Sequence, residues 1–107
     1  MIELRLNRPQ RLNAMTQALA LQLHQALQQA CADETVRVIL LSGAGRAFCA
    51  GKDRDDPPTP DFVTTLQSLA QTMIESSKTI VCAVQGWVVG AGLELMLGAD
   101  LVFAGRS

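Results

Sequence analysis

Two glycine-containing segments carry the positions at which the backbone of this chain could do chemistry. They are Ser42–Asp53 and Gly86–Leu95, and each follows an apolar run. In open α/β sheets, ligands bind at the carboxyl ends of the strands, where such segments would lie. Gly90-Ala91-Gly92 would open a helix, whose first N–H groups have no partner within the helix. We expect this turn, together with a donor from the turn Ala50-Gly51-Lys52, to hold an oxyanion or a polarised carbonyl.

The common nucleotide-binding motifs do not fit these glycines. A phosphate loop needs four residues between its glycines, but five separate Gly45 from Gly51, and Asp53 stands where Ser or Thr is required. A dinucleotide fingerprint that starts at Gly90 would need glycine or alanine in place of Leu95. Each glycine segment taken alone is also compatible with an ordinary turn.

Glu94 is the candidate acid or base. It follows Ala91 by three residues, in the first turn of the expected helix. It could exchange a proton with a ligand bound at that turn, or it could simply favour the positive end of the helix dipole. His24 lies in the middle of a helix and is expected at the surface or at the boundary of the core, and Cys49 is expected to pack rather than react.

The remaining pattern predicts strands that alternate with helices. The expected strands are 2–6, 36–41, 79–84 and 101–104, and the expected helices are 17–32 after a Thr16 cap, 62–76 after an Asp61 cap, and one that begins near 93–97. This order predicts a parallel sheet with right-handed crossovers. The run Val36–Leu41 is almost wholly apolar, which favours a strand covered on both faces.

Composition limits the class of protein. The chain has 107 residues, 49% of them hydrophobic and 18% charged, and a formal net charge of -1, which indicates one globular domain at most. The near-neutral charge argues against nucleic acid or an anionic membrane as partner. The three cysteines are widely spaced, which argues against a disulfide framework. The spacing of Asp53, Asp55 and Asp56 does not fit a calcium-binding loop, which argues against a metal site. We expect a cytoplasmic protein.

Several segments together resemble the enoyl-CoA hydratase/isomerase (crotonase) family. They are Asn7–Met15, Arg46–Asp53, and Val84–Leu95 followed by Gly98–Ala104, which occur in the family's order and spacing. The resemblance covers nearly the whole chain. It implies an α/β, crotonase-like (ClpP/crotonase) fold of repeated β-β-α units, and an acyl-CoA thioester as the ligand.

The resemblance also implies roles for particular residues. The thioester oxygen would lie between the backbone N–H groups of Lys52 and Ala91, and Glu94 matches one of two glutamates of the hydratases. The other residues that it implies in substrate binding are Arg11, Ala14, Ala50, Gly51, Asp53, Arg54, Gly90 and Gly92. By charge, Arg8 and Arg11 could bind the nucleotide phosphates, or they could be solvated surface arginines. Coenzyme A is part of the substrate, so no separate cofactor is expected.

The resemblance leaves the reaction open. The second hydratase glutamate would lie after Ser107, so we expect residues 1–107 to be the N-terminal part of a single crotonase-like acyl-CoA-binding domain. The favoured activity is 2-enoyl-CoA hydration in fatty acid metabolism, by a lyase that forms homotrimers or hexamers when complete. The alternatives are a Δ3,Δ2-enoyl-CoA isomerase, another reaction of the family, and a non-catalytic fragment that binds CoA or a partner. The fragment alone is expected to be marginally stable.

Overall fold

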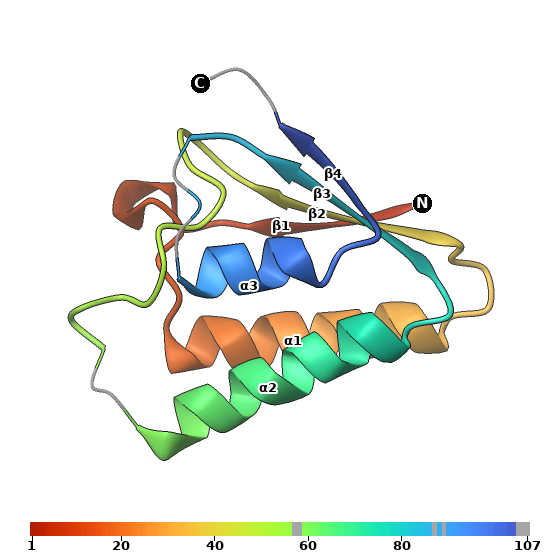
Figure 1. The fold of residues 1–107 in the computed structure, drawn as a ribbon, viewed down its shortest axis with the longest axis horizontal. Coiled ribbons are helices and arrows are strands. Elements are labelled where there is room, and N and C mark those ends of the chain that lie inside the picture. Colours follow the sequence, from red (N-terminus) through yellow and green to blue (C-terminus); the bar gives the residue numbers. More distant parts are fainter. Residues whose placement is uncertain (57–58, 87, 89, 105–107) are drawn as a thin grey trace.

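The computed structural model describes residues 1–56, 59–86, 88 and 90–104. Its centre is a parallel sheet with the strand order β1-β2-β3-β4 (Figure 1). The strands are β1 (Ile2–Leu6), β2 (Val38–Gly43), β3 (Thr79–Val84) and β4 (Leu101–Ala104). The predicted parallel sheet is therefore confirmed, although β2 begins and ends two residues later than expected. Val36 is buried in a turn before the strand, where its N–H donates to Asp33 O.

A helix connects each strand to the next. The helices are α1 (Gln17–Ala32), α2 (Pro60–Glu75) and α3 (Ala91–Leu97), and a 3₁₀ turn, Pro9–Arg11, follows β1. Thr16 caps α1 as predicted, because its hydroxyl accepts the N–H of Leu19 at 3.0 Å. The predicted Asp61 cap of α2 is wrong. Thr59 takes that place by accepting the N–H of Phe62, and Asp61 lies inside the first turn.

All three helices lie on one side of the sheet (Figure 1). Each helical connection leads to the neighbouring strand, and the chain always advances across the sheet in the same direction. When crossovers of this kind share one handedness, their helices all lie on the same face of the sheet. Ile39 and Leu41 of β2 face the helices and are buried, whereas Val38 and Leu40 point the other way and are only half-buried. The expectation that this run is covered on both faces is therefore wrong for the part of the chain that the structure describes.

The core fills the space between the sheet and the helices. Its buried side chains include Leu23, Leu27, Ile39, Leu41, Leu69, Met73, Ile80, Cys82 and Leu95. Figure 1 shows the consequence for the loops: those after β1, β2 and β3 gather at the carboxyl ends of the strands. None of the described helices combines the length and the apolar character that a membrane crossing requires.

Candidate functional site

The segment after β1 is paired with the loop after β2. Met15 N–H donates to Gly51 O at 2.6 Å, and Asp53 N–H donates to Met15 O at 2.8 Å, which makes a parallel bridge between Met15 and Lys52. In such a bridge the residue between the two bonded groups turns its own N–H to the opposite side. The N–H of Lys52 therefore points away from Met15.

The loop after β3 lies against the loop after β2. Cys49 and Val88 form a second parallel bridge. A Cβ placed on Gly90 would lie 3.5 Å from the Cα of Gly51, and both glycines have positive φ, +54° and +99°. A Cβ on Gly92 would lie only 2.5 Å from the carbonyl oxygen of Cys49. The two glycine segments singled out in the sequence are thus in direct contact.

Helix α3 starts at this contact. Ala91 is its first residue, so its N–H has no partner within the helix. Glu94 lies in the first turn, as predicted. The side chains of Ala91, Leu93 and Glu94 lie outside the described part of the chain, so the acid–base role of Glu94 stays a prediction.

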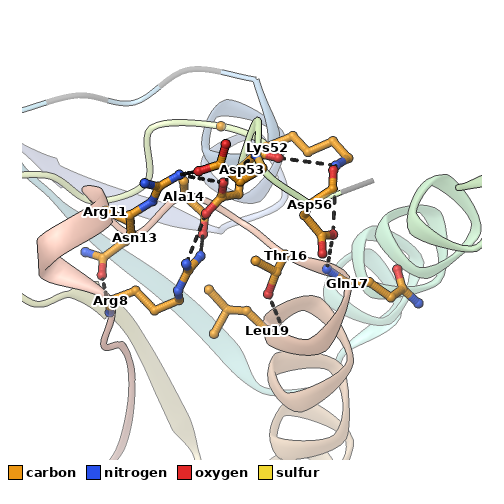
Figure 2. A network of polar contacts seen from close by, with 12 residues as sticks. Arg8, Arg11, Asn13, Ala14, Thr16, Gln17, Leu19, Lys52, Asp53 and Asp56 are labelled. Atoms are coloured by element: carbon orange, nitrogen blue, oxygen red, sulfur yellow. Dashed lines mark hydrogen bonds and ion pairs between the residues drawn. The ribbon is translucent and has the colours of Figure 1, made fainter. Parts of the chain in front are cut away.

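Asp53 holds two arginines from the segment after β1 (Figure 2). Its side chain is 3% exposed; Oδ2 accepts from Arg8 Nη2 at 3.0 Å, and Oδ1 accepts from Arg11 Nη2 at 2.9 Å. The Arg11 hydrogen bond, then the Asp55 N–H and the Arg8 guanidinium, hold the pKa of Asp53 well below its usual range. Arg8 also donates to Ala14 O at 2.6 Å. The two candidate phosphate ligands are therefore bound to an internal carboxylate.

The side chain of Lys52 extends toward Asp56, near the start of α1 (Figure 2). Its Nζ donates to Asp56 O at 2.6 Å and lies 5.0 Å from the ring centroid of Phe62. Asp56 Oδ2 in turn accepts the N–H of Gln17 at 3.0 Å, at the first turn of α1. The oxyanion role that the resemblance implies for Lys52 concerns its backbone N–H and stays a prediction.

Asn13 is a site residue that the sequence analysis missed. It is fully buried with φ of +56°, and its Nδ2 donates to Ala44 O and Ala47 O at 2.8 Å each. Its Oδ1 accepts the N–H of Arg8 at 2.7 Å. The available signal was an Asn inside a loop, because Asn tolerates left-handed backbone better than most residues. Asn13 ties the segment after β1 to the loop after β2.

A cavity of about 470 Å³ opens beside this network. Six of the predicted residues line it: Arg11, Ala14, Ala50, Lys52, Asp53 and Arg54. The predicted Gly51, Gly90 and Gly92 instead form the contact between the two loops. The structure thus brings the predicted binding residues from two distant segments to one concave surface.

Other reactive groups take no part in this surface. Burial raises the pKa of the Cys49 thiol, and that of the Cys82 thiol to about 11. Cys49 is fully buried in the core cluster, which confirms its packing role. His24 is half-buried on α1, 3.1 Å from the Thr72 hydroxyl of α2. Among the described residues, no three His, Cys, Asp or Glu side chains lie together as metal ligands would.

Solved structures identify the class of fold. A crystal structure of an enoyl-CoA hydratase from Mycobacterium avium subsp. paratuberculosis K-10 matches with a TM-score of 0.91 and 28% identity, over 96% of this chain and 42% of that chain. A monofunctional enoyl-CoA isomerase from M. smegmatis matches with a TM-score of 0.82 and 30% identity, over 96% of this chain and 44% of that chain. The fold is that of the crotonases.

The sequence places the chain in a family. The model of the enoyl-CoA hydratase/isomerase family matches residues 1–107, and the chain belongs to this family. A 1,2-epoxyphenylacetyl-CoA isomerase of Escherichia coli (strain K12) is 41% identical over 97% of this chain and 44% of its own length. The 2,3-dehydroadipyl-CoA hydratase of the same strain is 36% identical, over 97% of this chain and 42% of its own length. The chain therefore spans less than half the length of these relatives.

Proposed function

We propose that this protein processes acyl-CoA thioesters and adds water to the double bond of a 2-enoyl-CoA. The observation that carries the proposal is the contact between Gly51 and Gly90. It brings together the two turns whose next residues, Lys52 and Ala91, supply the expected oxyanion donors. The homology to enoyl-CoA hydratases supports the same chemistry.

The two backbone donors act on the thioester oxygen. When water attacks the β-carbon, the electron pair of the double bond moves through the carbonyl, and negative charge develops on that oxygen. The N–H groups of Lys52 and Ala91 stabilise this enolate-like charge, and a donor of this kind typically lowers the barrier by about 3 to 4 kcal/mol. Glu94 positions the water and takes its proton, and the acid so formed returns a proton to the α-carbon, so that OH is added at the β-carbon, H at the α-carbon, and the carboxylate is restored.

The cavity beside the Asp53 network receives the coenzyme A part of the substrate. Arg11 remains 44% exposed despite its bond to Asp53, and Arg54 is also exposed at the cavity wall. These cations favour the nucleotide phosphates, and the small Ala14 and Ala50 leave room for the pantetheine arm. In the complete protein we expect a cytoplasmic homo-oligomer that needs no cofactor besides this substrate.

A second candidate is isomerisation. It is favoured by the relative at 41% identity, which is named 1,2-epoxyphenylacetyl-CoA isomerase. The same oxyanion pair would stabilise the enolate formed when a proton is removed next to the thioester. In this candidate reaction a group other than Glu94 moves the proton, so that Glu94 is dispensable.

A comparison of Glu94→Gln with the unchanged protein tests the role of Glu94 in hydration. The measurement is the loss of ultraviolet absorption when a short 2-enoyl-CoA is hydrated. We expect a decrease in kcat of about 100-fold or more, because a general base contributes about that much. Glu75→Gln is the control, since Glu75 is exposed at the end of α2. Near-normal hydration by Glu94→Gln contradicts the assigned base, and CoA binding without any turnover favours a binding fragment.

A further inference from the structure

Asp53 occupies an unusual place for a charged side chain. Its carboxylate is almost fully buried, yet it lies one residue after the proposed oxyanion donor Lys52. Its own N–H bonds to Met15 O, on the neighbouring segment. Its backbone and side chain therefore both bind the segment after β1.

The ion pairs of Asp53 reinforce the backbone pairing that orients Lys52. Arg8 precedes the 3₁₀ turn that follows β1, and Arg11 is its last residue; each reaches across to one oxygen of Asp53 (Figure 2). The backbone bonds of Met15 to Gly51 and Asp53 lie at the same junction. A charged hydrogen bond shielded from water resists opening more than one exposed to it.

Asp55 provides an internal comparison. It also binds Arg11, but its side chain is 78% exposed, and its own N–H donates to the Asp53 side chain rather than to the segment after β1. Exposed ion pairs contribute little to rigidity or stability. The two aspartates therefore differ in burial and in backbone pairing while they share one arginine.

We propose that Asp53 is a positioning residue for the oxyanion donor. Its buried carboxylate, bound to Arg8 and Arg11, holds the loop after β2 against the segment after β1 and so keeps the N–H of Lys52 aimed at the substrate oxygen. Asp53 itself does not touch the reacting atoms. This inference rests on the proposed function, because the donor has a purpose only if a carbonyl oxygen binds there.

The first test measures the pairing without any ligand. In Asp53→Asn, the amides of Met15 and Ala50, which donate across the junction, should exchange with solvent at least tenfold faster than in the unchanged chain. In Asp55→Asn they should change by less than about twofold. Equal exchange in Asp53→Asn and the unchanged chain would overturn the proposal.

The second test measures the donor on a bound probe. The absorption of 4-(dimethylamino)cinnamoyl-CoA moves to longer wavelength when its carbonyl oxygen accepts hydrogen bonds, because that state draws charge toward the oxygen. We expect this shift with the unchanged chain and with Asp55→Asn, and a loss of at least half of it with Asp53→Asn. The shift is read on fully bound probe, so it is independent of affinity.

The outcomes separate this inference from the proposed function. An unchanged shift in Asp53→Asn overturns the positioning role. Absence of any shift in the unchanged chain overturns the oxyanion site itself, while the exchange data still report whether Asp53 holds the loop. If Asp53→Asn does not fold, Arg11→Gln replaces it, since Asp53 then keeps its bond to Arg8. Arg11→Gln should give an intermediate shift, and a value equal to that of Asp55→Asn would overturn the proposal.

Discussion

Gly90 lies directly against Gly51, so closely that a Cβ on Gly90 would be 3.5 Å from the Cα of Gly51. The two residues are in loops that follow different strands, β2 and β3. Their contact places the start of α3 beside the turn that carries Lys52. The distance between the two proposed donors therefore depends on how these two backbone segments meet.

Gly92 should be less replaceable than Gly90, although both lie where the two loops meet. Its added Cβ would lie 2.5 Å from the carbonyl oxygen and 2.7 Å from the Cβ of Cys49, which is far inside normal contact. Ala has a better helix propensity than Gly by about 1 kcal/mol, but overpacking against backbone costs about 1 to 3 kcal/mol. We expect Gly92→Ala to lower the free energy of unfolding, measured by urea denaturation, and to weaken acyl-CoA binding.

Gly90→Ala is the matched control for this substitution. Its Cβ would make an ordinary contact with Gly51, so only the positive φ of +54° is strained, at about 1 kcal/mol. We expect Gly90→Ala to be the milder of the two. A Gly92→Ala protein as stable as the unchanged chain would show that Cys49 and α3 can move apart freely.

The amide of Asn13 should contribute more to stability than its backbone conformation does. Gly accepts a φ of +56° without strain, so Asn13→Gly removes only the three side-chain hydrogen bonds. Leaving buried groups such as Ala47 O without their donor costs about 1 to 3 kcal/mol each. We expect Asn13→Gly to lose about 3 kcal/mol in urea denaturation.

Asn13→Ala separates the contribution of the side-chain hydrogen bonds from that of the left-handed backbone conformation. It loses the same hydrogen bonds and adds the strain of positive φ, so it should be about 1 kcal/mol less stable than Asn13→Gly. A nearly unchanged stability of Asn13→Gly would mean that water replaces the amide, and that the junction does not depend on it.

The regular elements were predictable where local patterns decide them. The strands Thr79–Val84 and Leu101–Ala104 follow from short apolar runs, the first of them rich in β-branched residues, and the Thr16 cap sets the start of α1. The start of β2 was not predictable, because Val36 is as apolar as the strand but is buried in a turn. Likewise, a cap at Thr59 competes with one at Asp61, and both have suitable side chains.

The site was predictable only in part. The glycines and the family resemblance indicated which backbone segments meet. The polar network depends on the path of the chain: Arg8 and Arg11 lie 45 and 42 residues before Asp53 in the sequence. No local period relates residues so far apart. Their pairing, and the burial of Asn13, therefore required the folded arrangement of the loops after β1 and β2.

The ion pairs of Asp53 should make the free energy of unfolding depend on pH in the acidic range. The pKa of Asp53 is lower in the folded chain than in the unfolded chain, where it is about 4. The ion pairs of Asp53 therefore contribute fully to stability at a pH above the unfolded pKa, and this contribution is lost as the pH falls through the folded pKa. The pKa values of Glu3 and Asp33 are lowered as well and act in the same direction. We expect the free energy of unfolding to decrease as the pH falls below about 4.

Asp53→Asn tests the share of this residue. Its stability should be lower than that of the unchanged chain at neutral pH, and the difference should shrink at pH 3 and below. The measurement is a series of thermal denaturations between pH 7 and pH 2. Two curves that run parallel over this range would show that Asp53 titrates alike in the folded and unfolded chains.

The three thiols should react in two classes. Cys31 is half-buried near the Ser76 hydroxyl, whereas Cys49 and Cys82 are buried and their pKa values are raised by burial. At pH 8, a disulfide reagent such as dithiobis(nitrobenzoate) should react promptly with one thiol and much more slowly with the other two, which should react promptly only after unfolding in urea. Cys31→Ser should remove the prompt reaction.

The slow reaction of Cys49 also reports the contact between the loops. The Cys49 carbonyl and Cβ lie against Gly92, so the thiol becomes accessible when α3 moves away from the loop after β2. An acyl-CoA that bridges Lys52 and Ala91 should hold the two loops together and slow the labelling of Cys49, with Cys82 as the internal reference. Equal labelling rates with and without acyl-CoA would contradict a ligand bound across this contact.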